Sequence, residues 1–128
     1  MQALPSVNVR IDRIAGVLYP NIGYRVLVQI RPEKIGSFGN LIRNPNGDLV
    51  PACAWMFPFT NYAETVIGIF LFPLNSRKET AKVKIPIRWL TPDTVIVQEF
   101  PMKSDEIKGP IYAFMKIHLA TDGAKPFN

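Results

Sequence analysis

Apolar residues occupy every second position through most of this chain, and this period constrains the fold more than any other feature. The alternation runs through residues 7–11, 24–30, 53–59, 83–89 and 111–119. Successive side chains of a β-strand point to opposite faces of its sheet. Each of these segments therefore predicts a strand with one face buried.

Eight short strands are predicted, separated by turn signals rich in proline, glycine and asparagine. They span residues 7–17, 24–30, 39–43, 53–59, 65–72, 81–90, 94–100 and 111–119. The segment 65–72 (TVIGIFLF) is apolar on both faces, which predicts a central, well-covered strand. No window shows a convincing helical period, and no linker or internal repeat divides the 128 residues. The sequence predicts one all-β domain over residues 1–128, an antiparallel sandwich or barrel.

Two prolines interrupt predicted strands, and two tryptophans fall on apolar positions of the alternation. Pro58 and Pro86 lack a backbone donor, which places them at sheet edges or bulges. Trp55 and Trp89 fall on core-facing positions of the alternation and are expected to pack in the core.

Cys53 and His118 are the single cysteine and the single histidine. Cys53 lies in an apolar run and is expected to pack as a small core hydrophobe. With one thiol no internal disulfide can form, which is typical of a reducing compartment. His118 lies on the face opposite Ile117 and is expected at the surface or partly covered. A catalytic thiol with His118 as its base is the weaker alternative.

The chain has a formal net charge of +5, from 15 lysine and arginine against 10 aspartate and glutamate residues. Such an excess favours phospholipid headgroups, nucleic acid or acidic protein surfaces, or it serves solubility alone. The first residues lack the basic start and apolar core of a signal peptide. The longest apolar run, 65–74, is too short for a membrane-spanning helix. We expect a cytoplasmic protein that meets a membrane, if at all, from its surface.

The order of the segments resembles that of a C2 domain over nearly the whole chain. The matching segments are VNVRIDRIAGV (7–17), GYRVLVQI (23–30), AWMFPF (54–59), TVIGIFLF (65–72), AKVKIPIRWL (81–90) and GPIYAFMKIHLA (109–120). The resemblance implies an eight-stranded antiparallel β-sandwich that works as a binding module. Its first and last segments suggest the circularly permuted, type II connectivity.

The chain departs from calcium-binding C2 domains, which place several aspartates in loops at one end of the sandwich. Its first loop, 16–24, contains no acid, and its third loop, 72–82, contains only Glu79 among cations. Asp48 in the middle loop is the other candidate ligand. Calcium needs a cluster of oxygen ligands, so we expect a domain that uses neither calcium nor another cofactor.

A row of cations lies beside and within the segment KETAKVKIPIRWL (78–90). Lys82, Lys84 and Arg88 share the face opposite the apolar positions, and Arg77 and Lys78 precede them. This row could bind anionic phospholipid headgroups, each cation contributing about 1 kcal/mol. Alternatively it is a solvated face that discourages pairing between sheet edges.

Three apolar residues fall in loops that a C2-like fold would bring to one end. Leu18 and Tyr19 lie in the first loop and Leu74 in the third. They could enter a membrane interface beside the cations, or cap the open end of the sandwich.

Catalysis and nucleic-acid binding are both weakly supported. The sequence has no glycine-rich phosphate loop, no Gly-x-Ser-x-Gly and no His-Glu-x-x-His. Exposed aromatics interleaved with cations, which would stack bases, are not evident. We therefore expect a non-enzymatic module that binds an anionic phospholipid surface. A protein-interaction or oligomerisation domain for an acidic partner is the alternative, and the oligomeric state is left open.

Overall fold

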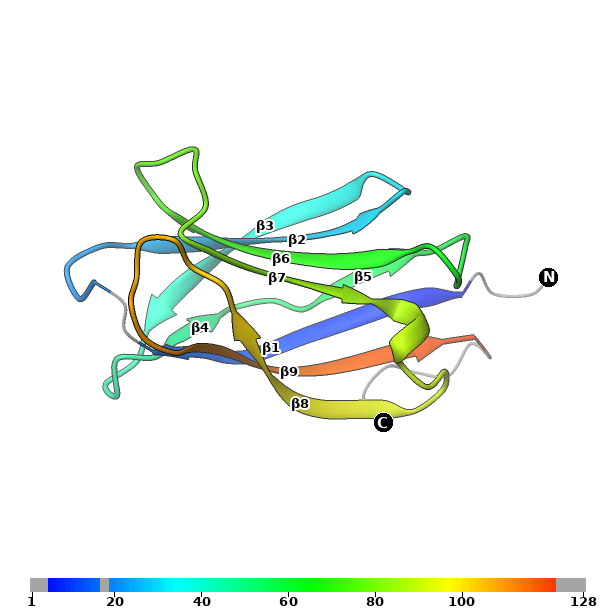
Figure 1. The fold of residues 1–128 in the computed structure, drawn as a ribbon. Coiled ribbons are helices and arrows are strands. Elements are labelled where there is room, and N and C mark those ends of the chain that lie inside the picture. The colour runs from blue at the N-terminus through cyan, green and yellow to red at the C-terminus, as the bar shows by residue number, and fades with distance from the viewer. Residues whose placement is uncertain (1–4, 17–18, 122–128) are drawn as a thin grey trace.

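The computed structural model describes residues 5–16 and 19–121, which contain nine antiparallel strands and one short 3₁₀ turn. The strands lie in two layers, as Figure 1 shows. Their bounds are β1 (Ser6–Gly16), β2 (Tyr24–Arg31), β3 (Ile35–Arg43), β4 (Leu49–Pro51), β5 (Trp55–Pro58), β6 (Val66–Pro73), β7 (Ala81–Pro86), β8 (Val95–Met102) and β9 (Ile111–Ala120), with the turn η1 at Ile87–Trp89. The predicted antiparallel β-sandwich is confirmed.

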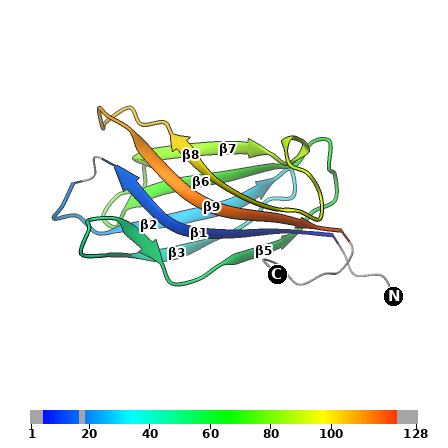
Figure 2. The same ribbon diagram turned by 90° about the horizontal axis from the view of Figure 1, so that it is seen from below.

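One layer has the strand order β7-β6-β2-β3, and the other is built around β1, β9 and β8. The strand β3 joins the layers, since it pairs with β2 along one stretch and with β4 along another. The strand β1 lies between β9 and the short strands β4 and β5, as the second view shows (Figure 2). A bulge between Ile11 and Arg13 shifts its register against β9. The first and last strands are therefore neighbours.

The core lies between the layers and is filled by the inward positions of the alternation. On β6 these are Ile67, Ile69 and Leu71, none of them exposed. Gly68 on the outer face is also buried, and β6 pairs on both sides, with β2 and β7. The predicted well-covered strand at 65–72 is confirmed.

Two strands differ from the sequence-based prediction. The segment expected as a short edge strand at 39–43 is part of the nine-residue β3, whose residues 35–40 pair with β2 and whose residues 41–43 pair with β4. Gly36 and Gly39 dilute its apolar alternation, which is why the pattern reveals only its second half. The three-residue β4 was not predicted, because a strand so short carries no period.

The predicted strand 81–90 ends at Pro86, and this overturns the assignment of Trp89 to the core. Pro86 has extended backbone angles, and the chain then turns into η1, where Leu90 N donates to Ile87 O at 3.0 Å. The turn replaces the period of two by a spacing of three, so Ile87 and Leu90 are buried. Trp89 falls outside and is 70% exposed, whereas Trp55 is 4% exposed, as predicted.

The expectations for Cys53 and His118 are both wrong. Cys53 is exposed, because it lies in the connection before β5 and outside the ladder. His118 is buried on β9, opposite Asn8 of β1. The strand β1 separates β9 from β5, so the weaker alternative of a thiol and histidine pair gains no support from the strand order.

The connections gather at the two ends of the sandwich. The connections β1–β2, β3–β4, β6–β7 and β8–β9 share one end, at the left in Figure 1. The connections β2–β3, β5–β6 and β7–β8 share the other. The expectation that the first and third loops lie at the same end is confirmed.

Glu33 joins two of the connections at the second end. Its Oε2 accepts hydrogen bonds from Thr60 N at 2.9 Å and from the Thr65 hydroxyl at 2.6 Å. Burial alone would raise the pKa of this carboxyl, but the hydrogen bonds from Thr65 and Thr60 outweigh it and hold the pKa below its ordinary value.

Because its pKa is lowered on folding, ionised Glu33 contributes stability that is present at neutral pH. This stability is lost as the pH falls below the unfolded value near 4.5 and through the lower folded value. We expect Glu33→Gln to lower the free energy of unfolding by about 1 kcal/mol at pH 7. Urea unfolding of both proteins at pH 7 and at about pH 3 checks this, since the gap should shrink at the lower pH. An equal gap at both values would show that the charge contributes nothing.

Candidate anion-binding surface

The edge strand β7 presents two of the predicted cations on the outer face of its layer. Lys82 lies opposite Phe70 of β6 and Lys84 lies opposite Gly68. Both lysines are exposed, while Ala81 and Ile85 on the other face are buried. The alternation thus places Lys82 and Lys84 on the outer face, as the sequence predicts.

The other three predicted cations lie beyond the ends of β7. Arg77 and Lys78 are exposed in the β6–β7 connection, where Lys78 N donates to Ser76 Oγ at 3.1 Å. Arg88 is exposed in η1, at the opposite end of the sandwich. It does not continue the row of Lys82 and Lys84, because the strand ends at Pro86. Two of the five cations therefore share the outer face of β7, and the other three lie beyond its two ends, so the five do not form a single cluster.

Strand pairing brings two further cations, Arg31 and Lys103, close to Lys82 and Lys84. Arg31 of β2 and Lys84 line one groove of about 230 Å³, together with Phe70 and Gly68. A side chain at position 68 would press on the Phe70 ring, since a Cβ there would lie 2.6 Å from Phe70 Cε2. Lys103 is bonded through its backbone to Lys82. A local sequence pattern could not predict that Arg31 lies near Lys84 or that Lys103 lies near Lys82, because the residues of each pair are distant in sequence.

The apolar loop residues lie at the first end. Tyr19 is 47% exposed and Leu74 is 59% exposed. Leu74 N donates to Gly23 O at 2.9 Å, and its side chain covers Gly23, where a Cβ would lie 2.6 Å from Leu74 Cδ1. Leu18 lies outside the described residues. The first and third loops are thus in contact, with apolar side chains partly open to solvent.

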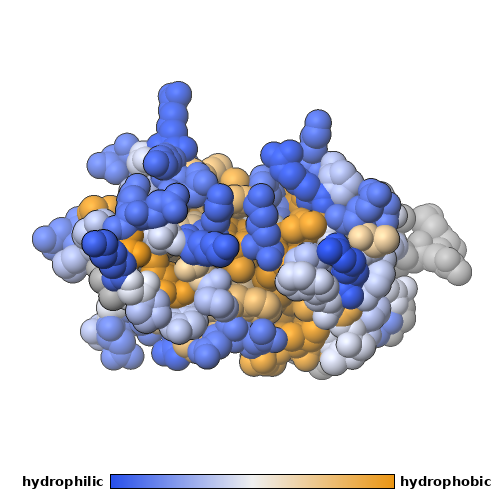
Figure 3. Space-filling view, in the orientation of Figure 1, coloured by the Kyte–Doolittle hydropathy of each residue, from blue (hydrophilic) through white to orange (hydrophobic). Residues whose placement is uncertain are grey.

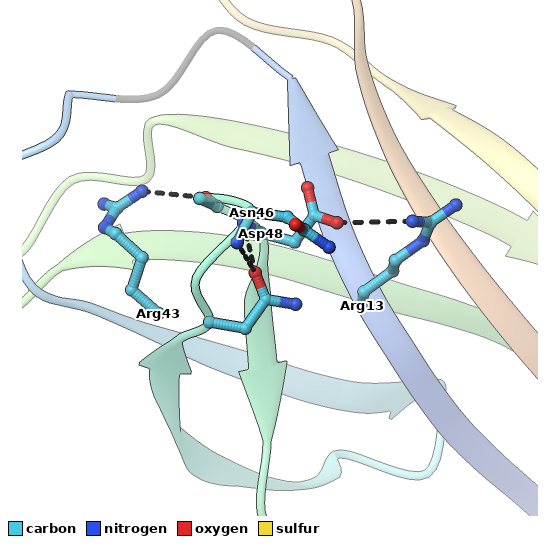
Figure 4. Close-up of polar contacts among 6 residues, drawn as sticks. Arg13, Arg43, Asn46 and Asp48 are labelled. Carbon is cyan, nitrogen blue, oxygen red and sulfur yellow. Dashed lines mark hydrogen bonds and ion pairs between the residues drawn. The ribbon is translucent and has the colours of Figure 1, made fainter.

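Arg43 bridges the β1–β2 connection and the β3–β4 turn. Its Nη2 donates to the carbonyl oxygens of Tyr19 at 2.9 Å and Ile22 at 3.2 Å, and its Nη1 donates to Gly47 O at 3.0 Å. Figure 4 shows the contact with the β3–β4 turn. Beneath the loop, burial raises the pKa of the Tyr24 phenol above its ordinary value, so this side chain stays neutral. The Arg43 guanidinium therefore links the β1–β2 connection to the β3–β4 turn.

Asp48, one of the two predicted calcium candidates, already has a cationic partner. Its Oδ2 lies 3.3 Å from Arg13 Nη1, and the two side chains point toward each other in Figure 4. Its backbone N–H and that of Asn46 both donate to Asn44 Oδ1 at 3.0 Å. The Asn44 side chain thus satisfies two backbone donors of the turn, and Arg13 neutralises the Asp48 carboxylate.

Glu79, the other candidate, lies near two acids from a distant part of the chain. It lines a pocket of about 300 Å³ with Asp105 and Glu106 of the β8–β9 connection. Lys82 and Lys103 line the same pocket. Within residues 5–16 and 19–121, no group of three or more His, Cys, Asp or Glu side chains has an arrangement that could hold a metal ion.

An aromatic cluster lies on the outer face of the β3-β2-β6 layer. The rings of Phe38 and Phe72 meet edge to face with centroids 5.7 Å apart. The guanidinium of Arg25 lies 4.2 Å from the Phe38 centroid. Phe38 is 48% exposed, so this apolar surface is open to solvent.

Comparisons with known proteins identify the fold. No protein-family model matches the chain, and no curated protein matches it. The first C2 domain (domain A) of plant extended synaptotagmin 1 superposes with a TM-score of 0.76 at 11% identity, covering 94% of this chain and 98% of that domain. The structure of the paired C2 domains A and B of extended synaptotagmin 2 gives 0.73 at 13% identity, covering 92% of this chain and 39% of that one.

A third similar structure is human GIVD cytosolic phospholipase A2, with a TM-score of 0.71 at 13% identity over 95% of this chain and 18% of the enzyme. The fold of the chain is that of a C2 domain, as the resemblance in sequence order implied. Among the residues the structure describes, no helix has the length and apolar character needed to cross a membrane.

Proposed function

We propose that this chain is a non-catalytic binding module that associates with anionic phospholipid membrane surfaces without calcium. The contact is made by Arg77, Lys78, Lys82, Lys84 and Arg88. The observation that carries the proposal is that all five side chains are exposed, two on β7 and three just beyond its ends. Each cation near an anionic surface contributes about 1 kcal/mol, so three engaged together strengthen binding by roughly a hundredfold.

The loop end supplies the apolar part of the contact. Tyr19 and Leu74 are exposed, and Arg77 and Lys78 follow Leu74 closely in the same connection. Tyrosine suits the membrane interface, because its ring is apolar and its hydroxyl stays hydrated. The module acts as a peripheral membrane protein on the cytoplasmic side.

Calcium independence is supported by the loops themselves. One of the similar structures is a calcium-bound form of the paired C2 domains of extended synaptotagmin 2. In this chain Asp48 is paired with Arg13, and lysines line the pocket beside Glu79. A hard cation needs several free oxygen ligands, and these positions oppose it with positive charge.

A second candidate function is binding an acidic protein partner. The exposed aromatic cluster of Phe38 and Phe72 favours it, since a flat apolar patch on an outer sheet face suits a protein surface. Ile42, near the end of β3, is also exposed.

Co-sedimentation with lipid vesicles separates the two functions. Vesicles of phosphatidylcholine alone are compared with vesicles containing phosphatidylserine, with calcium or with chelator, at low and at high salt. We expect binding only to the anionic vesicles, unchanged by chelator and weakened by salt, because salt screens exposed charges. Absence of binding at low salt would overturn the membrane function. Binding that requires calcium would overturn the calcium independence.

A further inference from the structure

The two layers face each other along a seam between the edge strands β7 and β8. Both strands lie along the same side of the sandwich in Figures 1 and 2. One backbone bridge closes the seam, with Lys82 N donating to Lys103 O at 2.9 Å and Lys103 N donating to Lys82 O at 2.8 Å. Two lysines thus occupy directly opposite positions of an antiparallel pair.

This placement brings like charges together. Residues that exchange both backbone hydrogen bonds have Cα atoms about 5.5 Å apart and side chains on the same face. Like charges directly opposite each other destabilise a sheet. No described acid forms an ion pair with Lys82, Lys84 or Lys103, the set that we call the basic seam. The acids Glu79, Asp105 and Glu106 line an adjoining pocket, which Lys82 and Lys103 also line.

The basic seam surrounds a pocket of about 310 Å³. Its walls are Lys82, Lys84 and Lys103, with Val83 and Pro101 between them. In Figure 3 hydrophilic side chains project over this side of the molecule, and hydrophobic surface shows between them. The pocket is therefore lined by three lysines and two apolar residues.

Two prolines oppose an added strand at this pocket. Backbone groups alternate in direction along a strand, so those of Pro86 point the same way as those of Lys82, toward the seam. By the same rule those of Pro101 point toward the seam from β8. Neither residue has an N–H to offer to a partner strand. An added strand would therefore find no backbone donor at these two positions.

We propose that the basic seam binds a phosphomonoester group. Such a group carries up to two negative charges and three terminal oxygens, which match three ammonium donors. A phosphodiester has one charge and two such oxygens, and it leaves one lysine without a partner. The source is a membrane lipid with a terminal phosphate or a soluble phosphate ester. The membrane source rests on the function proposed above, and the soluble source is independent of it.

Vesicles of phosphatidylcholine with either phosphatidic acid or phosphatidylglycerol, matched in surface charge, test the membrane source. The first anionic lipid presents a phosphomonoester and the second a phosphodiester. We expect binding to phosphatidic acid to be about tenfold tighter, because a charge-assisted hydrogen bond is gained. Lys103→Ala should abolish this preference. Lys108→Ala, an equal loss of charge at another exposed lysine of the β8–β9 connection, should retain it.

Glycerol 3-phosphate, followed by backbone amide shifts in NMR spectra, tests the pocket without a membrane. Shifts at Lys82 and Lys103 that Lys103→Ala removes and Lys103→Arg restores support the site, and the same spectra report whether each variant is folded. If vesicles bind without a phosphatidic acid preference and glycerol phosphate shifts nothing, this inference fails and the membrane function stands. If glycerol phosphate binds but no vesicle does, the seam binds a soluble ester and the membrane function fails.

Discussion

Trp55→Ala is expected to lower the free energy of unfolding by about 3–5 kcal/mol, a large part of the 5–15 kcal/mol typical of such a domain. Trp55 is 4% exposed, and its Nε1 donates to Ser37 O at 3.2 Å. Its ring lies across Gly39, where a Cβ would be 2.7 Å from Trp55 Cζ2. Truncation leaves a cavity between β5 and β3 and removes this hydrogen bond. Urea unfolding followed by circular dichroism measures the change.

Trp89→Ala is the matched control, because it makes the same change on an exposed side chain. Trp89 is 70% exposed, and alanine there should alter the unfolding free energy by no more than about 0.5 kcal/mol. Equal losses in the two variants would show that Trp89 is part of the core and that β7 continues beyond Pro86.

Reversing Lys82 and Lys84 together to glutamate should weaken binding to phosphatidylserine vesicles by roughly 30-fold to several hundredfold. Each lysine contributes about 1 kcal/mol of attraction, and each glutamate replaces it with repulsion, so the total change is about 2–4 kcal/mol. Both side chains point to solvent from β7, and the fold should be retained. Vesicle co-sedimentation at low salt measures the loss, and thermal unfolding checks the fold.

The control is the double variant Arg10→Glu/Lys116→Glu, which changes the net charge by the same amount. Arg10 and Lys116 are cross-strand neighbours on β1 and β9, in the other layer. The exposed ion pair of Arg10 with Asp12, at 3.6 Å, contributes little stability. We expect this variant to bind vesicles nearly as the wild type does. A similar loss in both variants would assign binding to net charge and not to the β7 surface.

Period-two alternation was sufficient to predict the layers because one face of most strands is buried. It located β2, β6 and β9 to within one or two residues. It failed where the backbone leaves the extended conformation, as at Pro86, since the tryptophan three residues later then turns outward. It also failed for Cys53 and His118, whose burial depends on strand ends and on neighbouring chain segments.

The candidate surface was predictable only as far as it lies on one strand. Lys82 and Lys84 alternate with buried neighbours, so their outward direction could be deduced. Lys103 follows β8 and meets Lys82 through a bridge between distant segments. Asp105 and Glu106 reach the pocket beside Glu79 in the same way. Contacts of this kind depend on how the two layers close, which no local period encodes.

The adjacency of β1 and β9 determines how the domain responds to a pulling force. The two strands run antiparallel, and the pair Ser6 and Ala120 stands at one end of their ladder. A force that separates these two residues loads the backbone hydrogen bonds of the β1–β9 ladder one pair after another, starting from this end. Rungs loaded singly yield at lower force than rungs loaded together. A tether on both sides of the domain would therefore peel β1 from β9 first, with the loops at the opposite end disturbed last.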